Sequence, residues 1–194
     1  MSDVTVFIGD SVTDCGREVE PPYGDGYVHM IANSGDLKGS IINVGTSGHR
    51  IVDLEARWQR DVLDHKPTRI SIAIGINDTW RRYDDNDITR VEDFEDRYRR
   101  VLNASQALLH PEFVLCEPFL LPVQEEMNTW REDLNPKIDV VHRLAKEFGA
   151  QVVAFDAHFT ALAKKMAMTQ LAEDGIHPTP LGHEEMAKLW LASL

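Results

Sequence analysis

Short segments rich in β-branched residues alternate with longer segments of helical period along this chain. Five short segments are candidate strands, at residues 4–9, 40–44, 69–75, 112–115 and 151–155. Apolar residues recur at spacings of three and four in four longer segments, at residues 51–62, 91–109, 134–148 and 186–194. This alternation is typical of a parallel sheet with helices on its faces. The sequence therefore predicts an α/β fold built on a parallel sheet of about five strands.

Length and charge limit the number of domains and the kind of partner. A chain of 194 residues with 43% apolar content can bury one sizeable core and is short for two, so we expect residues 1–194 to form a single domain. The formal charge of −12 disfavours binding to nucleic acid or to an anionic membrane, because both need clustered Lys and Arg. A small or neutral partner is therefore expected.

Cysteine usage and the N-terminal sequence favour the cytoplasm. Cys15 and Cys116 are far apart and have no metal-ligand spacing, so we expect two free thiols in a reducing compartment. The start, MSDVTVFIGD, lacks the pattern of a signal peptide, and no apolar run has the roughly 20 residues of a membrane span. The chain is therefore expected to be a soluble cytoplasmic protein, unless a leader peptide has been removed from it.

The Pro-, Gly- and acid-rich residues 15–26 are expected to form a surface loop. This loop is either a rim or lid beside the site or a plain connection.

Small and polar residues follow the first three candidate strands. They form the segments GDS at 9–11, NVGTSG at 43–48 and GIND at 75–78. Because ligands of open parallel sheets bind beyond the carboxyl ends of the strands, these segments form the candidate site. Ser11 is either the cap of a following helix or a nucleophile, which needs a histidine base oriented by a carboxylate. Asp174 and His177, three residues apart in the segment EDGIHP, are the candidate acid and base.

Acyl transfer to a serine also needs hydrogen-bond donors for the developing oxyanion. The candidates are the backbone N–H of Ser11 at the start of a helix, the N–H of Gly45 and the side-chain amide of Asn77. Gly45 and Gly48 could instead serve only a tight backbone geometry, and Asn77 with Asp78 could form a turn.

Other residues near these segments have several interpretations. Trp80, Arg81 and Tyr83 follow the third segment and are predicted to form a rim that binds a sugar face or a carboxylate, or a subunit contact in a homo-oligomer. His183 is expected in the last helix as a surface or hydrogen-bonded residue. A second acid and base pair, Asp156 and His158, lacks the flanking Gly and Pro of EDGIHP.

Four segments together carry a family resemblance: GDSVTD at 9–14, NVGTSG at 43–48, GIND at 75–78 and DGIHP at 174–178. They resemble, in order, the four signature blocks of the SGNH or GDSL-type hydrolases. The resemblance implies a flavodoxin-like three-layer α/β/α sandwich and a serine esterase whose family serine, glycine, asparagine and histidine match Ser11, Gly45, Asn77 and His177. Asp174 matches the third member of the triad. The G-x-S-x-G elbow is absent, which disfavours the α/β-hydrolase fold.

Longer stretches narrow the resemblance to one branch of the family. GDSVTDCGR, GYV, DLEARWQRDV and GINDTWRRYD are similar to the branch that includes acetylxylan esterases and related carbohydrate deacetylases. This similarity implies removal of acetyl groups from sugar hydroxyls, and a cytoplasmic member would act on short oligosaccharides. No metal or organic cofactor is required by a serine mechanism.

Three other functions remain open at the level of sequence. A thioesterase or lysophospholipase of the same family would need an apolar groove for a long chain. A metal-dependent phosphoester hydrolase would use the candidate ligands Asp10, Asp14, Asp78, Asp174 and His177. A non-catalytic carbohydrate-binding protein would carry the same residues without turnover.

Overall fold

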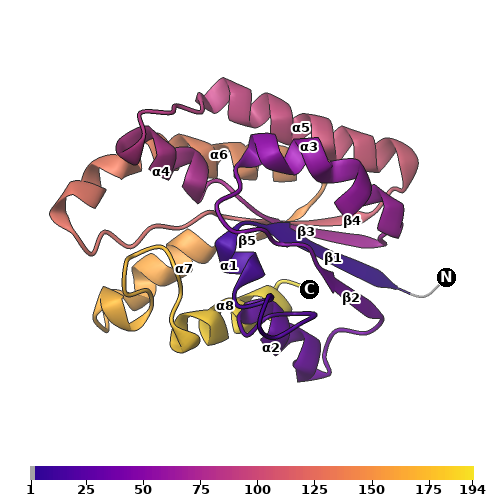
Figure 1. The fold of residues 1–194 in the computed structure, drawn as a ribbon, viewed down its shortest axis with the longest axis horizontal. Helices are drawn as coiled ribbons and strands as arrows, with labels where there is room; N and C mark the ends of the chain where they lie inside the picture. The colour runs from indigo at the N-terminus through magenta and orange to yellow at the C-terminus, as the bar shows by residue number, and fades with distance from the viewer. Residues whose placement is uncertain (1–2) are drawn as a thin grey trace.

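The computed structural model describes residues 3–194, in which five strands form one parallel sheet (Figure 1). The strands are β1 (Val4–Gly9), β2 (Ser40–Asn43), β3 (Arg69–Ala73), β4 (Glu112–Cys116) and β5 (Gln151–Val153). Their order is β2-β1-β3-β4-β5, the order of flavodoxin-like sheets. The predicted fold class is therefore confirmed. The strands β3 and β5 end at residues 73 and 153, two residues before the predicted ends, because helices begin almost directly after them.

Helices cover both faces of the sheet, which gives three layers. In Figure 1, α3, α4, α5 and α6 lie above the sheet and α1, α2, α7 and α8 lie below it. The helices are α1 (Ser11–Asp14), α2 (Tyr27–Ser34), α3 (Ile51–Asp61), α4 (Ile76–Asp84), α5 (Val91–Leu108), α6 (Arg131–Phe148), α7 (Phe155–Leu162) and α8 (Pro180–Ala192), with the 3₁₀ helices η1 (Leu63–His65), η2 (Glu125–Trp130) and η3 (Met168–Gln170). The last helix begins at Pro180, before the apolar stripe at 186–194, because Thr179 caps it and Pro180 suits its first turn.

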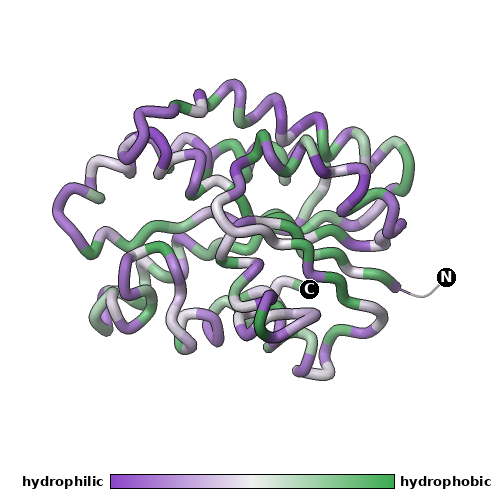
Figure 2. The backbone as a smooth tube through the Cα atoms, in the orientation of Figure 1, coloured by the Kyte–Doolittle hydropathy of each residue, from purple (hydrophilic) through white to green (hydrophobic). Residues whose placement is uncertain are grey.

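Each face of the sheet packs on its own apolar core, and β1 shows how the sequence divides between them. Val6 and Ile8 join the core beneath α3, α5 and α6, whereas Phe7 joins the core that contains α2 and α8. All three side chains are fully buried. This is the two-residue alternation of a strand that is covered on both sides. Figure 2 shows the same division, with hydrophobic residues along the central strands and many hydrophilic residues on the outermost helix, α5.

The topology brings the predicted polar segments to one edge of the sheet. Gly9 at the end of β1 is in register with Ala73 at the end of β3, and Asn43 at the end of β2 is in register with Phe7 of β1. The segments that follow these strands therefore emerge side by side. Within residues 3–194, no helix has the length and apolar character needed to cross a membrane.

Candidate active site

The structure brings Ser11, His177 and Asp174 into one hydrogen-bonded chain. The Ser11 Oγ lies 2.9 Å from the His177 Nε2, although 166 residues separate them in the sequence. On the other side of the ring, the His177 Nδ1 lies 2.6 Å from the Asp174 Oδ2. With the Nδ1 proton donated to the carboxylate, the Nε2 is free to accept a proton from the serine. This geometry is the one that a serine nucleophile, a histidine base and an orienting carboxylate require.

The loop that carries the acid and the base is fixed by its own backbone. The Asp174 Oδ1 accepts hydrogen bonds from the N–H groups of Ile176 (2.9 Å) and His177 (2.8 Å). Gly175 has a φ of 84°, and a Cβ there would lie 2.1 Å from the Leu121 carbonyl oxygen, so only glycine fits. Burial raises the pKa of Asp174, but the hydrogen bonds from the His177 ring and from the two N–H groups outweigh it, and the pKa is lowered overall. The carboxylate therefore stays ionised beside the base.

Ser11 is placed by a sharp turn from β1 into the short helix α1. Asp10 caps this helix, because its Oδ1 accepts the N–H of Val12 at 3.0 Å. A Cβ on Gly9 would lie 2.4 Å from the Ala73 carbonyl oxygen, so the chain can turn this close to β3 only with glycine. Burial raises the pKa of Asp10 to about 7. Asp10 is thus a structural cap, and Ser11 is the first residue of the helix, with its N–H lacking an intrahelical acceptor.

The predicted oxyanion donors differ in how they are used. Asn77 is buried at the start of α4, and its Nδ2 donates one hydrogen bond to the His49 carbonyl at 3.0 Å, which leaves the second amide proton available. The prediction for Gly45 needs correction, because its N–H donates to the Asn43 Oδ1 at 2.9 Å. A Cβ there would lie 2.4 Å from the Asp14 N. Gly45 therefore serves the close packing of its loop against α1.

Another glycine of the same loop has the properties that Gly45 lacks. Gly48 is exposed, has a φ of 79°, and has open space where a Cβ would be. Within residues 3–194, its N–H makes no hydrogen bond to a backbone carbonyl. The NVGTSG segment contains both glycines, and their sequence gives no sign of which one presents its N–H group.

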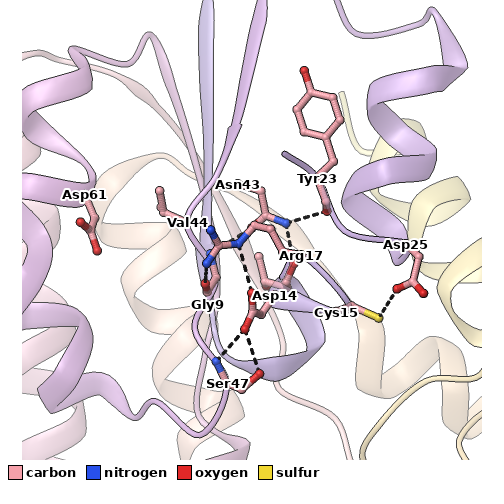
Figure 3. A network of polar contacts seen from close by, with 12 residues as sticks. Gly9, Asp14, Cys15, Arg17, Tyr23, Asp25, Asn43, Val44, Ser47 and Asp61 are labelled. Carbon is pink, nitrogen blue, oxygen red and sulfur yellow. Dashed lines mark hydrogen bonds and ion pairs between the residues drawn. The ribbon is translucent and has the colours of Figure 1, made fainter. Parts of the chain in front are cut away.

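Asn43 is a site residue that the sequence did not single out (Figure 3). Its Nδ2 donates to the carbonyl oxygens of Thr13 (2.7 Å) and Tyr23 (2.9 Å), while its Oδ1 accepts from Gly45. The side chain is 5% exposed. It therefore ties α1, the 15–26 loop and the loop after β2 together. The 15–26 loop is thus joined to the base of the site, and Arg17 extends the tie by donating to the Gly45 carbonyl at 2.7 Å.

The alternative acids and bases are occupied elsewhere. The His158 Nε2 lies 3.0 Å from Glu185, and Asp156 pairs with Arg131 at 2.7 Å. His183 is buried on α8, where its Nδ1 accepts the N–H of Tyr27 at 3.1 Å and its Nε2 lies 3.1 Å from the Cys15 Sγ. Burial lowers the pKa of His183 to about 4, so the ring is neutral at pH 7. His177 is thus the histidine that faces Ser11.

The metal-ligand set considered from the sequence is also dispersed. Asp10 binds the N–H of Val12, the Asp14 Oδ2 accepts the Ser47 hydroxyl at 2.9 Å, and the Asp78 Oδ2 accepts the N–H of Ile51 at 3.1 Å. In the part of the chain that the structure describes, no three His, Cys, Asp or Glu side chains are grouped as metal ligands.

The predicted rim is divided by the structure. The Trp80 ring lies 6.1 Å from the His177 ring, measured between centroids. Tyr83 stacks on Trp130 at 5.2 Å, an aromatic residue of η2 that the sequence did not connect with the site. Arg81 instead bonds to Asp84 at 2.8 Å within its own helix. The Arg81 guanidinium, which we predicted to bind substrate, is thus paired with Asp84 instead.

The parallel sheet, the serine at the end of its first strand and the His–Asp pair opposite define a hydrolase of the SGNH class. The chain belongs to the GDSL-like lipase/acylhydrolase family, whose model matches residues 7–185, and it is a carboxylic ester hydrolase. It is 34% identical to an acetylxylan esterase of Geobacillus stearothermophilus, across 97% of this chain and 92% of that protein.

Solved structures extend this comparison to the fold. The crystal structure of Axe2, an acetylxylan esterase from Geobacillus stearothermophilus, superposes with a TM-score of 0.88 at 32% identity, covering 98% of this chain and 93% of that one. A GDSL-like lipase candidate from Parabacteroides merdae has a TM-score of 0.92 at 31% identity, covering 99% and 95%. The predicted family and branch are confirmed by these relatives, and the chain is assigned to acetyl ester hydrolysis.

Proposed function

We propose that this protein is a serine esterase that removes O-acetyl groups from short carbohydrates. The observation that carries the proposal is the continuous hydrogen-bonded chain from the Ser11 Oγ through His177 to Asp174. A serine hydroxyl is a weak nucleophile unless a base accepts its proton, and this geometry supplies that base.

The reaction proceeds in two halves. The Ser11 Oγ attacks the ester carbonyl while its proton moves to the His177 Nε2, and the carbonyl π electrons move to oxygen. The carbon–oxygen bond to the alcohol then breaks, and His177 returns the proton to the departing oxygen. Water attacks the resulting acetyl-serine by the same route, which releases acetate and restores Ser11. Asp174 holds the His177 tautomer throughout.

The oxyanion formed in each half needs donors that no internal acceptor occupies. We assign this role to the N–H of Ser11, the second amide proton of Asn77 and the N–H of Gly48, in place of Gly45. Each donor of this kind contributes about 3–4 kcal/mol to the stability of the transition state in other hydrolases. No step requires a metal or an organic cofactor.

The surfaces beside the triad favour a short acyl group and a polar alcohol. One hollow next to His177 is lined by the loop residues Glu173, Asp174, Pro178, Thr179 and Pro180. A second hollow, beside α1, is lined mainly by polar residues of the 15–26 loop and the loop after β2. A thioesterase or lysophospholipase would need a long apolar groove, whereas each hollow is interrupted by charged side chains, such as Glu173 and Asp174 in the first and Arg17 and Glu18 in the second. The similarity to acetylxylan esterase points in the same direction.

Ser11→Ala tests the mechanism. The variant should fold with an unchanged melting temperature and lose turnover of p-nitrophenyl acetate, because no other group can form the acyl-enzyme. Ser34→Ala, at the end of α2, is the matched control and should keep the wild-type rate. If Ser11→Ala keeps wild-type turnover, the mechanism is wrong. A series of acyl chain lengths, assayed together with acetylated xylo-oligosaccharides, tests the substrate: faster turnover of octanoyl than of acetyl esters would contradict it.

A further inference from the structure

An aromatic stripe runs along α4 directly from the oxyanion amide. Asn77, Trp80 and Tyr83 are spaced by three residues, so their side chains succeed one another along one side of the helix. Asn77 is buried, whereas Trp80 and Tyr83 are half-buried. The helix that holds the amide therefore also presents Trp80 at the edge of the site, with its ring centroid 6.1 Å from that of His177 and the two planes at 59°.

Trp80 is braced from behind by two further rings. The Trp130 centroid lies 6.2 Å from the Trp80 centroid, and Tyr83 stacks on Trp130 with an angle of 9° between the ring planes. The Tyr83 hydroxyl donates to the Thr129 carbonyl at 2.9 Å, which fixes the stack to η2. Trp80, Trp130 and Tyr83 together are called the aromatic wall below.

The aromatic wall also rests on a small apolar core. Trp80 and Trp130 pack against the buried cluster Ile76, Leu120, Met127, Leu134 and Ile176. Ile176 belongs to the loop of the acid and base, so the wall and His177 share one support. The orientation of Trp80 relative to the base is thus set before any substrate binds, which lowers the entropic cost of binding a rigid ring.

The chemistry of the leaving group places its ring beside this wall. His177 returns its proton to the departing alcohol oxygen, so that oxygen must come within hydrogen-bond reach of the Nε2. The atoms attached to the oxygen then lie beside the His177 ring, whose centroid is 6.1 Å from that of Trp80. A pyranose ring has an apolar face of C–H groups and a polar edge of hydroxyl groups, and an indole offers a flat apolar face to match the former.

We propose that Trp80 is the platform for the sugar ring whose acetylated hydroxyl becomes the leaving group, and that Trp130 and Tyr83 hold Trp80 in place. This inference rests on the proposed function and adds a determinant of substrate choice. Trp80 acts on the alcohol portion of the ester and leaves the acetyl portion to the oxyanion donors. It therefore discriminates between esters that share an acetyl group and differ in the alcohol.

Two acetate esters separate these portions. Acetylated xylo-oligosaccharide presents a sugar ring to the wall, whereas ethyl acetate has no ring to place there, and release of acetate measures turnover of both. Trp80→Ala should lower kcat/KM for the sugar ester about tenfold, the loss expected for one aromatic contact of about 1.4 kcal/mol. The loss of kcat/KM for ethyl acetate should be several-fold smaller, because that ester has no ring for Trp80 to contact, and the ratio of the two losses measures the platform.

A second variant and a control keep the result interpretable. Trp80→Phe retains an aromatic face and should recover most of the activity on the sugar ester, even if Trp80→Ala is poorly folded. Leu108→Ala removes an exposed apolar side chain at the far end of α5 and should leave both esters at wild-type rates. Melting temperatures of all three variants identify any loss of fold.

The outcomes distinguish the platform from the esterase activity. An equal loss on both esters, or wild-type activity of Trp80→Ala on the sugar ester, would overturn the platform while leaving the esterase proposal standing. If the wild-type protein hydrolyses ethyl acetate but not the acetylated oligosaccharide, the carbohydrate substrate and the platform are both wrong. If it hydrolyses neither ester, the proposed function itself fails.

Discussion

Removing the side chain of Asn43 should lower both the free energy of unfolding and the rate of ester hydrolysis. Asn43→Ala deletes two donated hydrogen bonds, to Thr13 and Tyr23, and one accepted from Gly45. The residue is 5% exposed, so water does not readily replace them. The three backbone groups left behind belong to α1, the 15–26 loop and the loop after β2, which surround Ser11.

The magnitude follows from the number of bonds. At about 1 kcal/mol for each hydrogen bond, the free energy of unfolding should fall by about 3 kcal/mol. For a chain of this length, 1 kcal/mol lowers the melting temperature by roughly 2–4 °C, so the total fall should be roughly 6–12 °C. Turnover of p-nitrophenyl acetate at 25 °C should also fall, because the position of α1 relative to His177 is less well fixed.

Thermal unfolding followed by circular dichroism measures the first effect. Asn103→Ala, on the exposed side of α5, is the matched control and should stay within about 0.5 kcal/mol of the wild type. If Asn43→Ala melts within about 2 °C of that control, the reasoning that the three bonds hold the site together is refuted.

Three further changes have defined outcomes. Asp174→Asn should lower kcat on p-nitrophenyl acetate by on the order of 10⁴-fold, because an amide does not hold the His177 tautomer as the carboxylate does; a loss smaller than about tenfold would count against the triad. Gly45→Ala should lower the free energy of unfolding by about 1–3 kcal/mol in a denaturant titration, because its Cβ would lie 2.4 Å from the Asp14 N, and an unchanged midpoint would contradict the packing argument. His183 has a pKa lowered to about 4 from 6.5, so the unfolded chain takes up a proton that the folded chain does not, and the wild type loses stability as pH falls from 6.5 to 4. This loss is worth about 3 kcal/mol of unfolding free energy, and His183→Gln should remove it. If denaturant titrations give a difference in unfolding free energy between the two proteins that stays constant from pH 6.5 to 4, the assignment is contradicted.

The strands could be predicted from the sequence because each is a short, mostly apolar segment between turn residues, and β1 and β3 are in addition largely buried and contain β-branched residues. The helices α2, α4 and α7 were not predicted. The α4 segment, INDTWRRYD, is rich in polar residues, yet Ile76, Asn77, Asp78 and Thr79 are all buried. Their burial is explained by tertiary partners, such as the Ile51 N–H for Asp78 and Asp133 for Thr79, which hydropathy does not reveal.

In the candidate site, too, residues that depend on local contacts could be predicted from the sequence, whereas those that depend on distant contacts could not. Asp174 and His177 could be paired from the sequence because three residues and one glycine define their loop. Asn43 could not be identified, because its side-chain partners Thr13 and Tyr23 lie 30 and 20 residues away. The choice between Gly45 and Gly48 depends on which N–H is already bound, and that depends on the position of Asn43.

The order of the catalytic parts along the chain ties activity to the completion of folding. All five strands end by residue 153, but the acid, the base and α8 follow them. The α8 residue Trp190 is fully buried and donates from its Nε1 to the Ser71 Oγ of β3 at 2.9 Å, so the second core closes only when the last helix docks. A chain that ends before the loop at Asp174 would thus contain Ser11 but neither the acid nor the base. During refolding, hydrolysis of an ester should therefore begin only once the loop at Asp174 and His177 and the helix α8 have packed against the sheet. The onset of activity then measures the last step of folding.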